Sequence, residues 1–510
     1  MLVEPGLAVP GQAFGRQPVV ELRDAEGAPV AQGGVNVSVV VAAGTGTLNG
    51  TLTAATDGEG RASFTDLAIA GAGSHTLRFT APGLAPAVSQ GFFVEPPAPA
   101  PAKTYLVWAP RVVSAAAGGP ATLTAFIPGA PSAVRVALAG GGTTDLAHDG
   151  TYRWTATVQV AQLLSGYQTG DAHQFVGFLD VYDGATRTFR GNLFVNVLDA
   201  TMPAVTVSAL GPDAQASEYV VNLRFDSLYL GQPVPPDVAR RFYQLQADAF
   251  DFLAVVEQVE SFSNRFFVGA ANDVSGLGLP LFDNRATYGS AARLQGIIHF
   301  PIAGLFDLAE KAAVHELGHR WMSFLDNPVV LAGVPHWPIS DIAYGIMGFS
   351  IPPTQQGGEF PYALVAQSGG SYRLECVPRA TEYNDLELYL MGLLPADSVG
   401  PHAVFSNQDQ LGALACNGTL QGPVQTLTIA DVIAANGARP PAARRDLTLA
   451  TIVLSQGRLL TADEIAFFDY MAARGAARTE LPYTAGFSRG VTKPFYLATG
   501  GRASLETRVQ

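Results

Sequence analysis

Alternating apolar and polar positions dominate the first part of the chain. In "VNVSVVVA", residues Val35, Val37, Val39 and Val41 occupy every second position, and "HTLRFTA" repeats the pattern. Clusters of turn-forming residues such as "DAEGAP" and "TDGEG" separate these runs. A period of two is typical of strands with one buried face. Residues 1–95 are therefore predicted to form a β-sandwich.

A proline-alternating stretch, "PPAPAPAK" at residues 96–103, follows this domain. Such a composition predicts a semi-rigid, extended linker. Further candidate strands come next, most clearly "YLVWAP", "YRWTATVQV" and "NLFVNVL". They predict a second all-β sandwich domain over residues 104–200.

The pattern changes after residue 200. Apolar residues near helical spacing predict a helix within residues 235–259, namely Val238, Phe242, Leu245, Phe250, Leu253 and Val256. "RFFVGAAN" and "QGIIHFP" read as short strands, and "TADEIAFFDYMAARGA" reads as a late helix. This mixture predicts an α+β domain over residues 201–510.

The segment "KAAVHELGHRWMSFLDNP" at 311–328 carries the most specific chemistry in the chain. Asp307 and Glu310 form a plausible pair of N-terminal capping residues, and Asn327-Pro328 a plausible stop. In a helix between them, His315 and His319 project from one face, one turn apart, and can bind one tetrahedral zinc ion. Glu316 lies about 100° around the helix and faces the open coordination position, where it can act as general base.

Two histidines leave a tetrahedral catalytic zinc site one protein ligand short. The candidates for the third ligand are His336, Glu382, Asp385 and Glu387. Glu387 is preferred because it sits inside the apolar run "DLELYLMG", where a charged residue is costly unless paired or metal-bound. Glu382 and Asp385 lie at the polar entrance of that run, where solvated or capping roles are ordinary.

His336 follows His319 in the loop "GVPHWPISD" and has several possible roles. It can be the third zinc ligand, or it can hydrogen-bond the oxyanion of a transition state. It can also be an ordinary loop histidine stacked beside Trp337. These alternatives remain open at the level of sequence.

Several segments resemble known protein families. "LRDAEGAPV", "TDGEGRASF" and "GSHTLRFTA" resemble bacterial immunoglobulin-like modules of surface and secreted proteins. "AAVHELGHRW" resembles the active helix of zincin metallopeptidases. With "HWPISDIAYGIMG", "YNDLELYLMGLLP" and "FYLATGGRASLET", it resembles a group of secreted bacterial metalloproteases, gluzincin-like in type, over residues 220–505.

The resemblance implies a fold, an activity and a set of site residues. It implies two N-terminal immunoglobulin-like sandwich domains followed by a zincin-like α+β metallopeptidase domain that binds Zn²⁺. It matches Glu387 to the carboxylate of the family's LDLYLMGL segment, where aspartate is commoner. Pro338 stands where the family tends to have serine, which is a second departure from the pattern.

Composition narrows the range of partners and compartments. The chain has 510 residues, a formal net charge of −13 and no cluster of basic residues, which argues against nucleic-acid binding. No stretch approaches the roughly 18 apolar residues of a membrane span, and "MLVEPGLAVPGQ" does not resemble a signal peptide. The domain types still favour an exported protein whose targeting segment is absent from this sequence. In that setting Cys376 and Cys416 are expected to form a disulfide.

The leading functional hypothesis is a secreted or cell-surface zinc metalloendopeptidase, acting as a monomer on protein or glycoprotein substrates. A non-catalytic adhesin with a degenerate protease domain is one alternative, although the intact H-E-x-x-H argues against degeneracy. A zinc hydrolase of non-peptide amides or esters is another, and the sequence does not separate it from a peptidase.

Overall fold

Short strands make up most of the regular structure. The computed structural model describes residues 1–6, 10–71, 73–94, 100–148, 152–170, 172–263, 265–300, 311–322, 324–330, 336–344, 346–348, 362–376, 382–413, 417–482, 491–492 and 494–510. The chain divides into two compact units, Met1–Pro99 and Ala100–Gln510. Among the helices of the described residues, none combines the length and the apolar character needed to cross a membrane.

The first unit is all-β, as its alternating pattern predicts. Its strands are β1 (Val19–Glu21), β2 (Asn36–Ala43), β3 (Leu48–Asn49), β4 (Thr53–Ala55), β5 (Arg61–Ser63), β6 (Ala68–Ile69), β7 (Gly73–Thr80), β8 (Ala87–Val88) and β9 (Phe92–Val94). The main sheet has the order β4-β2-β7-β8, with β9 also paired to β7. Val37 and Val39 of β2 are buried while Ser38 and Val40 are exposed, so one face of the strand covers the core.

The second unit begins with two packed sheets, which confirms that this part is all-β. Its strands are β10 (Tyr105–Ala109), β11 (Val112–Ser114), β12 (Pro120–Phe126), β13 (Ala133–Leu138), β14 (Thr143–Asp145), β15 (Ala147–His148), β16 (Arg153–Gln159), β17 (His173–Asp183) and β18 (Thr186–Leu198), with the short helix α1 (Val160–Leu163). The sheet orders are β10-β12-β16-β15 and β11-β18-β17-β13-β14. Trp154, Ala156 and Val158 alternate inward along β16, as in a sandwich core.

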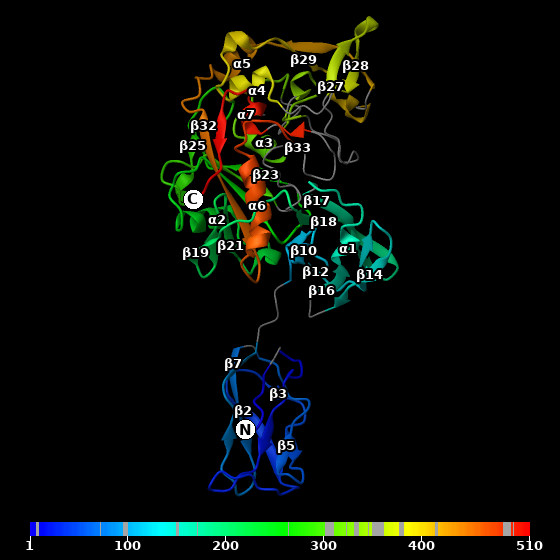
Figure 1. Cartoon of the computed structure of the whole chain (residues 1–510), viewed down its shortest axis with the longest axis vertical. Coiled ribbons are helices and arrows are strands. Elements are labelled where there is room, and N and C mark those ends of the chain that lie inside the picture. Colours follow the sequence, from blue (N-terminus) through cyan, green and yellow to red (C-terminus); the bar gives the residue numbers. More distant parts are fainter. Residues whose placement is uncertain are drawn as a thin grey trace. The chain divides into compact units, whose positions relative to one another are not determined.

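Residues 201–510 are built around one large mixed sheet (Figure 1). Its order is β19-β20-β21-β32-β22-β26-β23, with β35 paired to β32. The strands are β19 (Ser208–Gly211), β20 (Ala214–Ala216), β21 (Val220–Arg224), β22 (Phe252–Glu257), β23 (Phe266–Gly269), β26 (Gly296–Phe300), β32 (Asp446–Ser455) and β35 (Ser504–Glu506). The central strands β21, β32, β22 and β26 run parallel, and β23 is antiparallel to β26.

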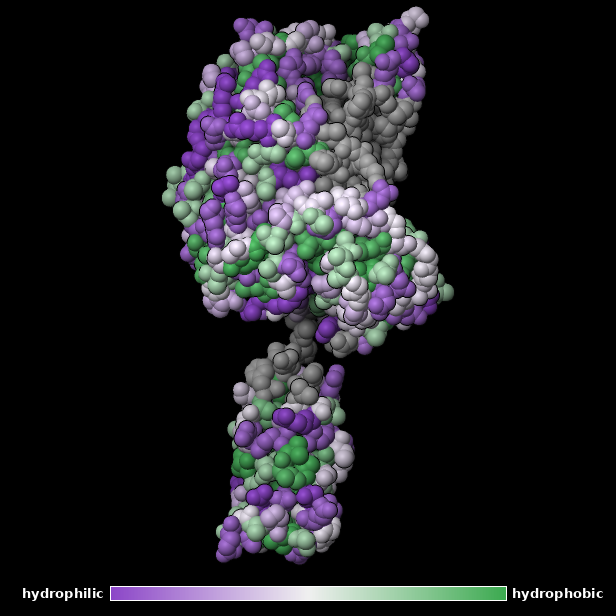
Figure 2. Space-filling view, viewed as in Figure 1, coloured by the Kyte–Doolittle hydropathy of each residue, from purple (hydrophilic) through white to green (hydrophobic). Residues whose placement is uncertain are grey.

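Helices and small sheets surround this sheet. The helices are α2 (Pro235–Tyr243), α3 (Lys311–Gly318), α4 (Asp385–Leu390), α5 (Ile429–Asn436), α6 (Ala462–Arg474) and α7 (Phe495–Ala498). The small strands are β24 (Ala271–Asn272), β25 (Phe282–Asp283), β27 (Tyr362–Ala366), β28 (Ser371–Cys376), β29 (His402–Phe405), β30 (Thr419–Gln421), β31 (Val424–Leu427), β33 (Leu481–Pro482) and β34 (Val491–Thr492). Hydrophilic and hydrophobic side chains are interspersed over the visible face of this unit (Figure 2).

Alternate residues of the central strands enter two separate cores. Phe252 and Val256 of β22 pack in the core that also holds Val314 and Leu317 of α3. Residues of the opposite parity on β22 pack with α2 on the other face of the sheet. One face of the sheet therefore forms the apolar surface against which α3 packs.

The predicted helix over residues 235–259 is wrong in its second half. Helix α2 ends at Tyr243, and Phe252–Glu257 form β22 instead. All six residues of β22 are buried because parallel neighbours flank the strand and both its faces are covered. Such a strand is a continuous apolar run, and periodicity alone does not separate it from a buried helix.

The residues taken as two domains, 104–200 and 201–510, lie in one compact unit. The Arg111 backbone N–H donates to Glu464 of α6 at 2.7 Å. Leu106 of β10 forms a backbone bridge with Glu260, just beyond β22. Phe126 stacks on Tyr229, with ring centroids 4.7 Å apart. The sandwich is thus packed directly against the large mixed sheet.

Candidate metal centre

The H-E-x-x-H segment forms a short helix whose described part is α3, Lys311–Gly318. The capping pair Asp307 and Glu310 lies outside the described residues. The expectation that the helix continues to Asn327 is wrong. After Gly318 the chain tightens into three-residue turns, in which the backbone N–H of His319 donates to the carbonyl of Glu316 at 3.2 Å.

The helix packs against a second chain segment at Gly318. A Cβ atom at this position would lie 2.3 Å from the Sδ of Met347, so any larger residue would force the Met347 side chain to move. The neighbouring carbonyl of Ile346 accepts a hydrogen bond from Nδ1 of His315 at 3.0 Å. This bond assigns the proton of His315 to Nδ1 and leaves the Nε2 lone pair available to a metal.

Three histidines converge next to this helix turn. Possible ligand atoms of His315, His319 and His336 all lie within 4.8 Å of one another. Nε2 of His315 and Nε2 of His336 are 3.1 Å apart. Two nitrogens bound to one tetrahedral zinc ion at about 2.05 Å would be about 3.3 Å apart. The histidine group could therefore hold a metal ion, and the His315–His336 spacing is close to that of two nitrogen ligands on one ion.

His336 is positioned by the residue that follows it. Trp337 is almost fully buried, and its backbone N–H donates to the carbonyl of Gly348 at 3.2 Å. Its indole N–H donates to Oε1 of Glu387 at 2.9 Å. Trp337 thus anchors the loop from which His336 reaches the other two histidines.

Glu387, the residue predicted as the third ligand, does not belong to the histidine group. Among the described residues, the group of potential metal ligands comprises three histidines and no carboxylate. Glu387 is fully buried at the third position of α4, where Oε2 accepts from the backbone N–H of Asn384 at 3.0 Å. Its other oxygen accepts from Trp337. The burial that suggested a metal ligand is explained by capping and by this indole hydrogen bond, and His336 replaces Glu387 as the third candidate.

The two weaker candidates, Asp385 and Glu382, also lie outside the group formed by His315, His319 and His336. Asp385 accepts from the backbone N–H of Gly400 at 2.7 Å and lies 3.1 Å from Nε2 of His402. Glu382 is exposed. The start of α4 nevertheless supports the site, because the side-chain amide of Asn384 donates to the carbonyl of Ile342 at 2.7 Å. The loop between His336 and Gly348 is therefore held by α4 at several points.

Burial sets the protonation state of the histidines. It lowers the pKa of His319 to about 3 and also lowers the pKa of His315 and of His336. The positive charge of Arg265 lowers all three further. The three imidazoles are neutral near pH 7, which is the form that binds metal.

Arg265, just before β23, is a site residue that the sequence analysis missed. Its Nε donates to Oε1 of Glu316 at 2.9 Å, and the Glu316 side chain is only 5% exposed. Burial raises the pKa of Glu316, and the guanidinium opposes that rise. The sequence "SNRFFVGAAN" contains one arginine and gives no indication that it contacts Glu316. The contact arises because β23 is the edge strand of the sheet and lies beside α3.

The predicted disulfide is not testable in the described part of the chain. Cys376 ends β28, and Cys416 lies outside the described residues. The pairing stays a prediction.

Comparisons with known proteins assign no family. No protein-family model matches the sequence, and no curated protein matches it. Among solved structures, the D0-D1 domain of intimin matches with 15% identity, covering 37% of this chain and 92% of that one, at a TM-score of 0.15. Extracellular domains 3–5 of Drosophila OTK match with 12% identity over 42% and 73% of the two chains, at 0.13. InvD of Yersinia pseudotuberculosis matches with 14% identity over 42% and 66%, at 0.15. At such TM-scores these likenesses carry no conclusion about fold or function.

Proposed function

We propose that the chain is a zinc metalloendopeptidase whose zincin-like catalytic domain lies within residues 201–510. The observation that carries the proposal is the convergence of three neutral imidazoles within 4.8 Å, with Glu316 between two of them in sequence. Three protein ligands and one open position is the arrangement of catalytic zinc sites, whereas structural sites are closed by a fourth protein ligand. No fourth histidine or carboxylate joins the group in the described residues.

His315, His319 and His336 would hold the zinc. When bound, zinc supplies Lewis acidity, which polarises a carbonyl group and makes water more acidic. The hydrogen bond from His315 to the carbonyl of Ile346 orients one ligand ring, and Trp337 orients the loop of another. These outer contacts support a site assembled before substrate binds.

Glu316 is the proposed general base. Its carboxylate takes the proton of the attacking water and then delivers it to the leaving amine. Arg265 favours the ionised form of this buried carboxylate, which is the form that accepts a proton. A buried base whose pKa is raised by burial, with Arg265 limiting the rise, is suited to this task near neutral pH.

The all-β first unit and the second sandwich support an exported protein that acts on protein or glycoprotein substrates. Their domain type is the basis for this part of the proposal. They would bring the catalytic domain to its substrate and take no part in the chemistry.

The test is elemental analysis together with a protease assay on a denatured protein substrate. We expect about one zinc per chain in the wild type and in Glu316→Gln, with activity at least about 100-fold lower in the variant. Glu480→Gln makes the same chemical change at an exposed position and should leave both zinc content and activity unchanged.

The remaining outcomes separate the alternatives. Absence of zinc, or equal activity in wild type and Glu316→Gln, would refute the proposal and favour a binding protein. Zinc-dependent cleavage of esters or small amides without peptide cleavage would favour the alternative that the protein is a zinc hydrolase of non-peptide amides or esters.

A further inference from the structure

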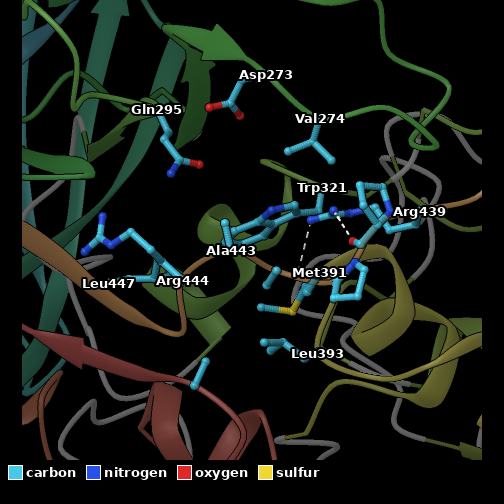
Figure 3. A pocket seen from close by; sticks show the side chains of 14 residues that line it. Asp273, Val274, Gln295, Trp321, Met391, Leu393, Arg439, Ala443, Arg444 and Leu447 are labelled. Atoms are coloured by element: carbon cyan, nitrogen blue, oxygen red, sulfur yellow. Dashed lines mark hydrogen bonds between the residues drawn. The ribbon is translucent and has the colours of Figure 1, made fainter.

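A cavity of about 380 Å³ lies on another part of the second unit, and the histidine group takes no part in its lining (Figure 3). The segment after α3, the residues just after α4, the loop 439–444 and Leu447 of β32 contribute to its walls. Apolar side chains form much of the lining, among them Val274, Trp321, Leu393 and Leu447. A volume of this size is in the range of small-molecule sites.

Arg439 brings a buried positive charge to this cavity. The residue is 8% exposed, and within the described residues its guanidinium donates to backbone carbonyls and to no side chain. Nε donates to Leu390 at 2.8 Å, Nη1 to Pro440 at 2.5 Å and Nη2 to Met391 at 3.3 Å. No described carboxylate lies within ion-pair distance of it. Three of its five N–H groups are used in these bonds, and the other two have no hydrogen-bond acceptor among the described residues.

A buried cation without a counter-ion is costly, because neutral carbonyls compensate a full charge only in part. Another buried arginine near the cavity shows the usual solution, since Arg320 pairs with Asp273 at 3.2 Å. Asp273 also contacts Arg285 at 3.4 Å, so this carboxylate of the lining already has two cationic partners. Positive charges therefore outnumber negative ones around the cavity, and Arg439, which also feels the more distant charge of Asp273, has no ion-pair partner in the described residues.

Trp321 adds a second donor. The residue is 6% exposed and lines the cavity, and its indole carries one N–H donor. Arg444, the other cation of the lining, is paired with Asp251 at 2.7 Å. Together, Arg439 and Trp321 offer donors to an acceptor that is negatively charged.

We propose that this cavity binds a small aliphatic carboxylate. The carboxylate occupies the donors of Arg439 and Trp321, and the hydrocarbon part contacts the apolar wall formed by Val274, Leu393 and Leu447. The positive charge of Arg439 favours an anionic ligand. The apolar side chains of the wall favour an anion that also has a hydrocarbon group. The site does not depend on the proposed zinc chemistry.

Isothermal titration calorimetry of the full chain, in a buffer without chloride or phosphate, tests the proposal. The probes are 4-methylpentanoate, acetate and the neutral 4-methylpentan-1-ol. We expect 4-methylpentanoate to bind one to one and at least tenfold more tightly than either of the others. 4-Methylpentanoate should bind more tightly than acetate because it buries more CH₂ groups. It should bind more tightly than the alcohol because its carboxylate accepts charge-assisted hydrogen bonds.

Two variants probe the site in different ways. Arg439→Gln removes the charge and should weaken binding of 4-methylpentanoate at least tenfold. Ala443→Phe keeps Arg439 but adds a ring at the exposed edge of the lining, and it should abolish binding even if Arg439→Gln fails to fold. Ala435→Phe, at an exposed position of α5 outside the lining, is the matched control and should bind as the wild type does.

Failure of the wild type to bind 4-methylpentanoate would overturn the proposal. So would equal binding by Ala443→Phe and Ala435→Phe, or equal affinity for the alcohol. Equal affinity for acetate and 4-methylpentanoate would reduce the cavity to a nonspecific anion site, which is also contrary to the proposal.

Discussion

Glu387→Gln changes a buried carboxyl to an amide of the same shape, and the structure predicts how its effect depends on pH. Burial raises the pKa of Glu387 from 4.5 to about 7, and the hydrogen bonds from Asn384 and Trp337 offset that rise only in part. Each unit of pKa corresponds to about 1.4 kcal/mol, so the difference amounts to about 3 kcal/mol. Because the side chain is fully buried, solvent screening does not reduce this figure much.

The sign follows from which state binds the proton more tightly. Between pH 4.5 and 7 the folded protein keeps Glu387 protonated, while the unfolded chain releases the proton. The contribution of Glu387 to the free energy of unfolding is therefore largest below about pH 4.5. It is lost as the pH rises to about 7. The free energy of unfolding of the wild type relative to Glu387→Gln should fall by about 3 kcal/mol over this range.

A second effect is independent of pH. Glutamine can still accept from the indole of Trp337, but its amide group cannot also accept from the backbone N–H of Asn384. Loss of this capping bond costs about 1 kcal/mol. The variant should therefore be less stable than the wild type near pH 4.5 and more stable near pH 8.

Urea unfolding of both proteins, followed by tryptophan fluorescence at several pH values with a chelator present, measures this difference. Subtraction of the two curves removes the contribution of the histidines, which both proteins share. Glu464→Gln is the matched control, since Glu464 holds the same capping position in α6. Burial alone would raise the pKa of Glu464, but hydrogen bonds from Arg458 and Thr461 outweigh it and lower the pKa. Its difference curve should stay flat from pH 4.5 to 8, and a flat curve for Glu387→Gln as well would refute the reasoning.

Three further predictions concern the site and its surroundings. His336→Ala should lower zinc content at least tenfold in elemental analysis, whereas Glu387→Gln should retain full zinc; the reverse result would restore the carboxylate as the ligand. Gly318→Ala should lower stability by about 1–3 kcal/mol, because its Cβ would meet Met347; an unchanged melting temperature would contradict this contact. Cys376 and Cys416 should give no free thiol when the denatured, unreduced protein is titrated, and two free thiols would show that no disulfide forms.

The sequence predicted local features better than long-range ones. The alternating valines of β2 and the H-E-x-x-H spacing are local signals, and both match the described structure. The strand β22 was mistaken for helix because its burial on two faces depends on β26 and β32, which lie far away in sequence. Local periodicity contains no information about such neighbours.

The third ligand could not be chosen for a related reason. A buried carboxylate indicates some partner, but the sequence does not say whether that partner is a metal or an N–H group. For Glu387 the partners include N–H groups of Trp337, Asn384 and Met347, and Trp337 stands beside the histidine that joins the group. The "HW" and "DLELYLMG" segments lie in contact through Trp337 and Glu387, and the described metal-ligand group includes His336 and not Glu387.

The three consecutive residues after Gly318 have different partners in three directions. His319 joins the histidine group, Arg320 binds Asn272 and Asp273, and Trp321 lines the cavity. No side chain in this run can compensate for its neighbour, and a one-residue insertion or deletion here would displace all three at once. During evolution the segment should therefore tolerate changes of length poorly, even where single substitutions are accepted.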